Sequence, residues 1–230
     1  EAAAAVNPQD GSLVAVVPGQ SQGLVTAVPV STGATVGGAV VVRPSNPPLN
    51  PPASPFASTT NPAIGIDAGG IATAGWQLEV NGSPRIVQVR RLNATAMTTL
   101  GGAPTSLDDG LATDYNQYGP MIAVTPGGAA AAGWYETTSF ADSNNAIVRA
   151  FAPGNLEDVG VVGPKQQLDG VGRAASVSDL IPGSGNLVTA FEFGATLNSQ
   201  ADGCRVATLD ASTGGLVGAA EQLAPGNCYA

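Results

Sequence analysis

Two stretches of the chain repeat one pattern: Pro62-Ala-Ile-Gly-Ile-Asp-Ala-Gly-Gly-Ile-Ala-Thr-Ala-Gly-Trp76 and Pro120-Met-Ile-Ala-Val-Thr-Pro-Gly-Gly-Ala-Ala-Ala-Ala-Gly-Trp134. In both, the tryptophan follows the proline by 14 residues (76 − 62 and 134 − 120), and a Gly-Gly pair lies at the same offset. Self-similarity at a fixed period is the signature of a repeat protein, because each unit must stack on its neighbours to bury its apolar faces. We therefore predict a repeat architecture.

The repeat extends in both directions. Leu187-Val-Thr-Ala-Phe191 matches Leu24-Val-Thr-Ala-Val28, and aligning Phe191 and Val28 with the tryptophans gives positions 28, 76, 134 and 191. The intervals are 48, 58 and 57 residues (76 − 28, 134 − 76, 191 − 134). Four units of about 50 residues then account for nearly the whole chain.

Each unit is predicted to hold four short antiparallel strands. A first strand meets the Gly-Gly turn, a second runs into the aromatic residue, and a third follows a variable polar loop. A weaker fourth segment ends the unit, near Leu107-Asp-Asp-Gly110 in one copy. The predicted first strands are Ala63 to Ile66 and Met121 to Val124, the second Ile71 to Glu79 and Ala129 to Glu136, and the third Arg85 to Leu92 and Ala146 to Phe151.

Units of this length and strand number are typical of a β-propeller. The residues that carry the pattern are Pro120, Ile122-Ala123, Gly127-Gly128, Trp134 and Ile147-Val148-Arg149, with Pro62, Ile64, Gly69-Gly70, Trp76 and Ile86-Val87 in the sister copy. They resemble the divergent propeller repeats of many secreted bacterial proteins. The resemblance covers residues 62 to 226 well and 13 to 43 weakly, and implies an all-β, β-propeller-like fold of about four units. The Ser-x-Asp-x-Gly-x-x-Trp box of sialidases and the WD40 pairing are not in the sequence.

The domain organisation follows from a proline-rich segment. Residues 44–62 hold seven prolines, which cannot donate to a sheet ladder. We expect residues 1–43 to form an N-terminal segment with a first, degenerate blade and residues 44–61 a loop or linker. Residues 62–230 are expected to form three further blades.

The charge balance excludes several classes of function. Seventeen acidic residues against eight basic ones give a net charge of −9, which would repel nucleic acid. The chain has no histidine, so the commonest general base and zinc ligand is missing. No apolar run approaches the roughly 18 to 20 residues that span a bilayer, so membrane insertion is not expected.

Cys204 and Cys228 are the two cysteines, and their spacing is not that of a metal site. Two buried free thiols and a disulfide are both compatible with the sequence. The composition resembles that of secreted proteins, in which disulfides persist. This favours a disulfide that closes the last repeat. We therefore expect an extracytoplasmic protein, secreted or on the cell surface.

The candidate ligand-binding residues are Trp76, Trp134, Glu79 and Glu136. The tryptophans could stack on a sugar, but a repeated large residue beside small ones more often fills the space between blades. Two carboxylates that lie close together could hydrolyse a glycosidic bond. Carboxylates that recur once in each blade are, however, more typical of the solvent-facing ends of strands. No catalytic residue is assigned, and the tryptophans are expected in the core.

A metal or other cofactor is not expected, with structural calcium as the alternative. Acidic residues gather at Asp108-Asp109, Asp114 and Glu157-Asp158, without the spacing of an EF-hand loop. The arginines of the predicted third strands are expected to pair with neighbouring acids across strands rather than to bind anions; they are Arg85, Arg90, Arg91 and Arg149. No metal site is therefore predicted.

The function predicted from the sequence is a non-catalytic scaffold or recognition module, a subunit of a larger surface assembly. Its partners would be another protein or a second copy, with carbohydrate as the other candidate. The first alternative is a carbohydrate-active propeller enzyme that uses Glu79, Glu136 or Asp67 as paired carboxylates. The second is a sugar-binding lectin.

Overall fold

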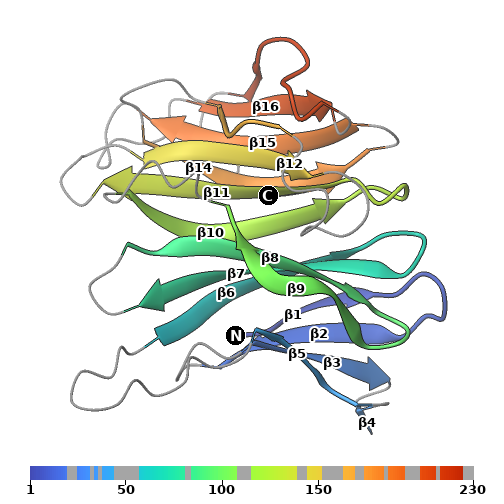
Figure 1. Ribbon diagram of the computed structural model, residues 1–230. Helices are drawn as coiled ribbons and strands as arrows, with labels where there is room; N and C mark the ends of the chain where they lie inside the picture. Colours follow the sequence, from blue (N-terminus) through green and yellow to red (C-terminus); the bar gives the residue numbers. More distant parts are fainter. Residues whose placement is uncertain are drawn as a thin grey trace, which may run out of the picture.

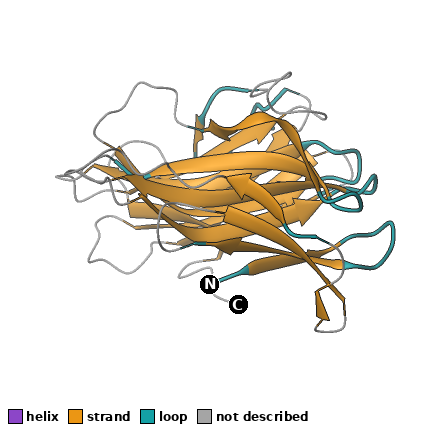
Figure 2. Ribbon diagram, turned by 60° about the horizontal axis from the view of Figure 1, so that its bottom comes forward, coloured by secondary structure: helices purple, strands orange, loops and turns teal. Residues whose placement is uncertain are grey.

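The computed structural model consists of strands joined by loops and turns, with no helix in the part that it describes (Figure 2). The residues that the structure describes are 1–19, 25–31, 34–35, 38–43, 57–80, 84–107, 115–138, 144–151, 163–168, 174–183, 186–194, 203–210 and 213–224. This confirms the prediction of an all-β protein.

The described strands form four antiparallel sheets, each made of strands that follow one another in the chain. The first sheet holds β1 (Ala3–Val6), β2 (Leu13–Pro18), β3 (Val25–Ser31), β4 (Ala34–Thr35) and β5 (Val40–Arg43). The second holds β6 (Ala57–Ile66), β7 (Ile71–Val80), β8 (Ile86–Asn93) and β9 (Thr98–Ser106). The third holds β10 (Tyr115–Val124), β11 (Ala130–Thr138), β12 (Asn144–Phe151) and β13 (Gln166–Gln167). The fourth holds β14 (Ala174–Pro182), β15 (Asn186–Gly194), β16 (Gly203–Asp210) and β17 (Glu221–Ala224).

The four sheets stack face to face in chain order, from the first at the bottom of Figure 1 to the fourth at the top. Each of the three interfaces holds its own apolar cluster. Trp76 lies in the cluster between the first and second sheets, and Trp134 in the cluster between the second and third. Each tryptophan therefore packs against the sheet that precedes its own.

Burial follows the position of a sheet in the stack. In β2 of the first sheet, buried and more exposed residues alternate, because only one face of that sheet is covered. In β7 of the second sheet, residues 72–78 are all buried, because neighbouring sheets cover both faces. A run of small residues such as Ala72-Thr-Ala-Gly75 suits this position, since it lets a neighbouring sheet approach on either side.

The first strands of the second and third sheets are longer than the sequence predicts. β6 and β10 begin six residues before Ala63 and Met121, because a β-bulge lets each strand continue through its proline. The register shifts between Thr60 and Ala63 in β6, and the equivalent shift in β10 follows Tyr118. The residue before each proline is left-handed, with φ of 50° at Asn61 and 58° at Gly119. At a bulge the ladder is interrupted, so a proline without an N–H is tolerated.

One part of the predicted repeat is wrong. In each sheet the aromatic position lies four residues after the first paired residue of the second strand: Trp76 follows Ala72, and Phe191 follows Leu187. In the first sheet that paired residue is Leu13, so the equivalent position is Val17 in β2. Val28 lies in β3, the third strand of its sheet. With Val17 the intervals become 59, 58 and 57 residues (76 − 17, 134 − 76, 191 − 134).

The predicted domain limits can be set beside the strands. The first sheet ends at Arg43, and β6 begins at Ala57, so residues 57–61 of the expected linker belong to a strand. The rest of that segment lies outside the described residues, as does Cys228. Cys204 is in β16, and its disulfide with Cys228 stays a prediction.

Candidate functional site

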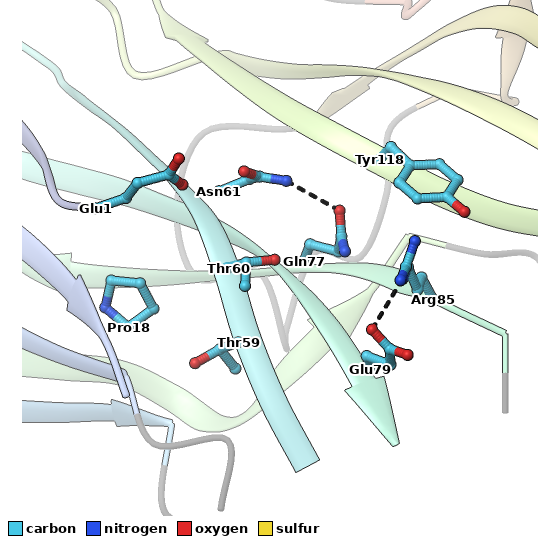
Figure 3. A pocket seen from close by; sticks show the side chains of 9 residues that line it. All are labelled: Glu1, Pro18, Thr59, Thr60, Asn61, Gln77, Glu79, Arg85 and Tyr118. Carbon is cyan, nitrogen blue, oxygen red and sulfur yellow. Dashed lines mark hydrogen bonds and ion pairs between the residues drawn. The ribbon is translucent and has the colours of Figure 1, made fainter. Parts of the chain in front are cut away.

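A hollow of about 480 Å³ opens where the first three sheets meet. The second sheet contributes β6, the end of β7 and the residue before β8, and the third sheet contributes β10. The first sheet contributes Pro18, and Glu1 lies two residues before β1. The side chains that line it, drawn in Figure 3, are Glu1, Pro18, Thr59, Thr60, Asn61, Gln77, Glu79, Arg85 and Tyr118. Most of them are polar, so the hollow can offer many hydrogen bonds to a ligand.

Strand alternation directs Gln77 and Glu79 to the hollow. Side chains on a β-strand point alternately to opposite faces, so these two share a face while Trp76 and Leu78 enter the apolar core. Gln77 is buried, and its Oε1 accepts a hydrogen bond of 3.1 Å from Nδ2 of Asn61. Glu79 lies near the end of β7, where its side chain stays 43% exposed.

Glu79, Arg85 and two tyrosines form a row across the second and third sheets. Arg85 Nε donates to Glu79 Oε2 at 2.9 Å, and the guanidinium carbon lies 4.9 Å from the centre of the Tyr118 ring. Tyr118 in turn stacks on Tyr135, with ring centres 5.0 Å apart and planes 10° apart. The hydrogen bond to Glu79 raises the pKa of the Arg85 guanidinium, as does Tyr118 more weakly. Burial raises the pKa of the Tyr135 phenol.

The two bulges shape the neighbouring wall. A second hollow, of about 310 Å³, shares Glu1 and Asn61 with the first and is otherwise lined by Ala2, Pro62, Gly119, Pro120 and Met121. Its walls are the Asn61-Pro62 and Gly119-Pro120 segments, which are the bulged parts of β6 and β10. The site therefore has a polar part beside Glu79 and a more apolar part beside the prolines.

Glu136 lies away from the hollow, although the sequence names it with Glu79 as a carboxylate two or three residues from the repeated aromatic. It is 3% exposed, and its Oε1 accepts hydrogen bonds from Gln117 Nε2 at 2.9 Å and from Trp134 Nε1 at 3.1 Å. Lys165 Nζ lies 3.0 Å from both of its carboxylate oxygens. A buried carboxylate with this many partners joins the strands of the third sheet. The structure does not bring it together with Glu79.

Asp67 has a structural place as well. It begins the turn between β6 and β7, and its Oδ1 accepts a hydrogen bond of 2.8 Å from the backbone N–H of Ile71. The turn ends at Gly70, whose φ of 77° favours glycine. Gly128, with φ of 88°, has the same place in the third sheet. Of the three carboxylates named for the enzyme alternative, Glu79 is thus the one that lines the hollow.

The two tryptophans are fully buried, and each Nε1 has an acceptor within the protein. That of Trp76 is Oε1 of Gln88, at 3.3 Å. Rings enclosed in this way fill the space between sheets. A sugar-binding site built on their faces has no support in the structure.

Sequence reasoning finds Glu79 but misses Asn61, Gln77 and Tyr118. Asn61 and Tyr118 belong to strands whose bulges are invisible in a pattern of apolar residues. The signal that could have found them is the proline that follows Asn61 and Gly119, since a proline inside a predicted strand indicates a bulge or an edge. The prediction that third-strand arginines pair with neighbouring acids is confirmed for Arg85 by its ion pair with Glu79. Backbone carbonyls accept from the other three, Arg90, Arg91 and Arg149.

Two further observations concern metals and membranes. Within the described ranges, no three acidic or cysteine side chains gather as a metal site would require, while the acidic residues at 108–109, 114 and 157–158 fall outside those ranges. The described part also contains no helix that is long and apolar enough to cross a bilayer.

Comparison with known proteins gives a fold. No protein-family model and no curated protein matches the sequence. Among solved structures, the chain is similar to the Hadza microbial sialidase Hz136, with a TM-score of 0.58 and 12% identity over 97% of this chain and 46% of the sialidase chain. It is also similar to the α-L-arabinanase of Penicillium chrysogenum complexed with arabinobiose, with a TM-score of 0.51 and 10% identity over 97% of this chain and 76% of that one. The chain thus spans less than half of the sialidase chain.

These similarities correct the predicted function. Both neighbours are enzymes by name, a sialidase and an arabinanase, so the prediction of a non-catalytic scaffold that is not an enzyme is contradicted. The comparison favours the carbohydrate-active alternative instead. Together with the four stacked antiparallel sheets, it confirms the predicted fold: the chain is a divergent β-propeller.

Proposed function

We propose that this protein is a carbohydrate-active enzyme that hydrolyses a glycosidic bond in the hollow beside Glu79. The observation that carries the proposal is the position of Glu79, a partly exposed carboxylate that lines the hollow and is held by Arg85. The similarity of the fold to a sialidase and an arabinanase supports the class of reaction.

Most glycoside hydrolases use two carboxylic groups, one to protonate the leaving oxygen and one to act as base or nucleophile. Glu79 and Glu1 are the acidic residues that line the hollow, and Figure 3 places them at opposite ends of the lining, with Asn61 and Gln77 between them. In our proposal Glu79 acts as base or nucleophile, because Arg85 fixes its orientation, and Glu1 supplies the acid.

The remaining polar groups suit a sugar. Sugar hydroxyls both donate and accept hydrogen bonds, and the side chains of Thr60, Asn61 and Gln77 offer both kinds of partner. Pro62, Pro120 and Met121 in the adjoining hollow would contact the C–H faces of a second ring. The two hollows together would hold more than one sugar unit.

The test is hydrolysis of a panel of oligosaccharides by wild-type protein and by Glu79→Gln, measured as the release of reducing ends. The isosteric amide should lower kcat by about 10²–10⁴-fold, the range of acid–base catalysis, while substrate binding is retained. Asp10→Asn is the matched control, because Asp10 is a fully exposed acid in the turn after β1. Equal rates for wild type and Glu79→Gln, or no hydrolysis of any glycan, would contradict the proposal.

We also propose that the protein self-associates through the outward face of the first sheet, with a second copy as the partner. Exposed apolar side chains on that sheet support this: Val6, Leu13, Val17 and Val41 are 61, 36, 41 and 48% exposed. Sedimentation equilibrium should show a dimer for wild type and a monomer for Val17→Asp. A monomeric wild type would refute it.

We place the protein outside the cytoplasm, where it would meet extracellular glycans. The predicted Cys204–Cys228 disulfide supports this location, because disulfides persist in oxidising compartments. Mass spectrometry of the unreduced protein after thiol alkylation should find neither cysteine labelled. Two labelled thiols would remove this support.

A further inference from the structure

The hollow holds more acidic than basic residues. Glu1 and Glu79 are the acids of its lining, and Arg85 is the one basic residue among them. Arg85 is already engaged, because its Nε donates to Glu79 and its guanidinium lies over the Tyr118 ring. Tyr118 also contributes to the raised pKa of Arg85, so the cation stays charged and partnered. A carboxylate on a ligand would find no unpaired cationic side chain in this lining.

Three other cations in the described ranges have partners away from this hollow. Arg90 and Arg91 are 7 and 1% exposed, and they donate to backbone carbonyls of Val42 and Gly128 in the neighbouring sheets. Lys165 is paired with Glu136. The chain as a whole carries a net charge of −9, so the long-range field repels anions as well.

The adjoining hollow adds no positive charge. Apart from Glu1, its lining consists of Ala2, Asn61, Pro62, Gly119, Pro120 and Met121, all of them uncharged side chains. A second sugar ring placed there would again meet neutral or acidic surroundings. Like charges placed side by side at an interface are strongly unfavourable, and this is one way in which a site rejects the wrong partner.

We infer that this site selects uncharged oligosaccharides and rejects glycans that carry carboxylates. The inference rests on the proposed function, because it names the substrate class of the same hollow. Glu79 contributes to this selectivity in two ways. Its negative charge repels an anionic sugar, and its ion pair with Arg85 keeps the guanidinium from binding the carboxylate of such a sugar.

Binding to matched pairs of ligands tests this inference. Trigalacturonic acid and 3′-sialyllactose are each compared with their methyl esters, which keep the skeleton and remove the negative charge; arabinotriose serves as a neutral reference. Affinities are measured by isothermal titration calorimetry at 20 mM and at 500 mM NaCl. For each pair that binds, the ester should bind at least fivefold more tightly than the acid at low salt. The ratio should shrink at high salt, because the Debye length falls from about 20 Å to about 4 Å.

Two variants locate the effect. Glu79→Gln removes one negative charge and releases Arg85, so the ratio of ester to acid affinity should fall at least threefold. Asp10→Asn removes the same charge from the exposed turn after β1 and should leave the ratio unchanged.

The outcomes separate this inference from the proposed function. An acid that binds wild type as tightly as its ester would overturn the substrate class alone, and the hydrolytic proposal would stand. An unchanged ratio in Glu79→Gln would likewise overturn it. If arabinotriose and both pairs failed to bind or to be cleaved, the proposed function would fail, and the inference with it.

Discussion

Arg85 Nε lies 2.9 Å from Glu79 Oε2, across the connection between β7 and β8. The arginine also lies over the Tyr118 ring, so the third sheet helps to orient a carboxylate of the second. Both charged side chains are more than a third exposed, as 35% and 43% of their surfaces meet solvent. An ion pair with this exposure contributes little to stability, about 0–1 kcal/mol. The main contribution of this ion pair is to hold the Glu79 carboxylate in one orientation.

Arg85→Ala should therefore lower activity without unfolding the protein. The Glu79 carboxylate would lose its fixed orientation, and we expect kcat to fall by about tenfold or more. The melting temperature should change by only a few degrees, as for an exposed pair. Arg85→Lys should restore part of kcat, since an ammonium keeps the charge but lacks the planar donor and the ring contact. Steady-state kinetics and thermal melts check this. If Arg85→Ala were partly unfolded at the assay temperature, to an extent that accounts for the whole fall in kcat, a positioning role would be refuted.

The stack of Tyr118 on Tyr135 gives a prediction on pH. Burial, with a smaller effect from Tyr118, raises the pKa of Tyr135 above its ordinary 10.0, while Arg85 lowers it slightly. Because the folded-state pKa exceeds the unfolded one, Tyr135 contributes stability in full below pH 10, and this is lost as the pH rises through the folded pKa. Urea unfolding between pH 8 and 11 should show a steeper decline for wild type than for Tyr135→Phe. Parallel curves would show that Tyr135 does not titrate in this way.

Close packing between the second and third sheets depends on Gly65. A Cβ atom on Gly65 would lie 2.7 Å from Cγ2 of Val124, a β-branched side chain with little freedom to move. Gly65→Ala should cost about 1–3 kcal/mol of unfolding free energy. At Gly75 the clash is with Cδ1 of Ile122, at 2.9 Å, and the flexible end of that chain can shift. Gly75→Ala should therefore cost less.

Double substitution provides the control for this packing argument. Val124→Ala creates room beside residue 65, so Gly65→Ala/Val124→Ala should be more stable than the sum of the two single changes predicts. Chemical denaturation of the four proteins measures the coupling. Strict additivity would show that the two residues do not meet as described.

The buried pair of Glu136 and Lys165 gives a further stability prediction. The side chains are 4% and 22% exposed, so Lys165→Met leaves a nearly buried carboxylate without its cation. We expect a loss of about 3 kcal/mol or more. Lys165→Met/Glu136→Gln should recover most of it, because no unpaired charge remains. If the double variant were less stable than Lys165→Met alone, the charge would not be the cause.

The fold could be predicted from the sequence because its signals are local. The turn after the first strand requires a left-handed residue, which the second glycine of each Gly-Gly pair provides at Gly70 and Gly128. The aromatic position follows this glycine at a fixed distance in the sequence. The predicted alignment of the first unit is wrong because its turn, residues 7–12, has no Gly-Gly pair and is one residue longer than the turn between β6 and β7. The apolar match at Val28 lies in another strand, β3.

The site could be predicted only in part. Alternation along β7 places Glu79 on a polar face, and this pattern is visible in the sequence. Which residues meet it is not, because Tyr118 comes from another sheet and Asn61 reaches the hollow through a bulge. Glu136 shows the opposite error: it follows Trp134 by two residues, whereas Glu79 follows Trp76 by three, so it shares the face of its tryptophan. Lys165 and two further donors enclose it in the core.

The most direct test of the account is the rate of glycoside hydrolysis by Glu79→Gln, measured beside wild type and Asp10→Asn on an uncharged oligosaccharide. The account predicts that Asp10→Asn keeps the wild-type rate, while Glu79→Gln loses about 10²–10⁴-fold in kcat and still binds the oligosaccharide. A Glu79→Gln protein as active as wild type would contradict the central claim that Glu79 performs the chemistry.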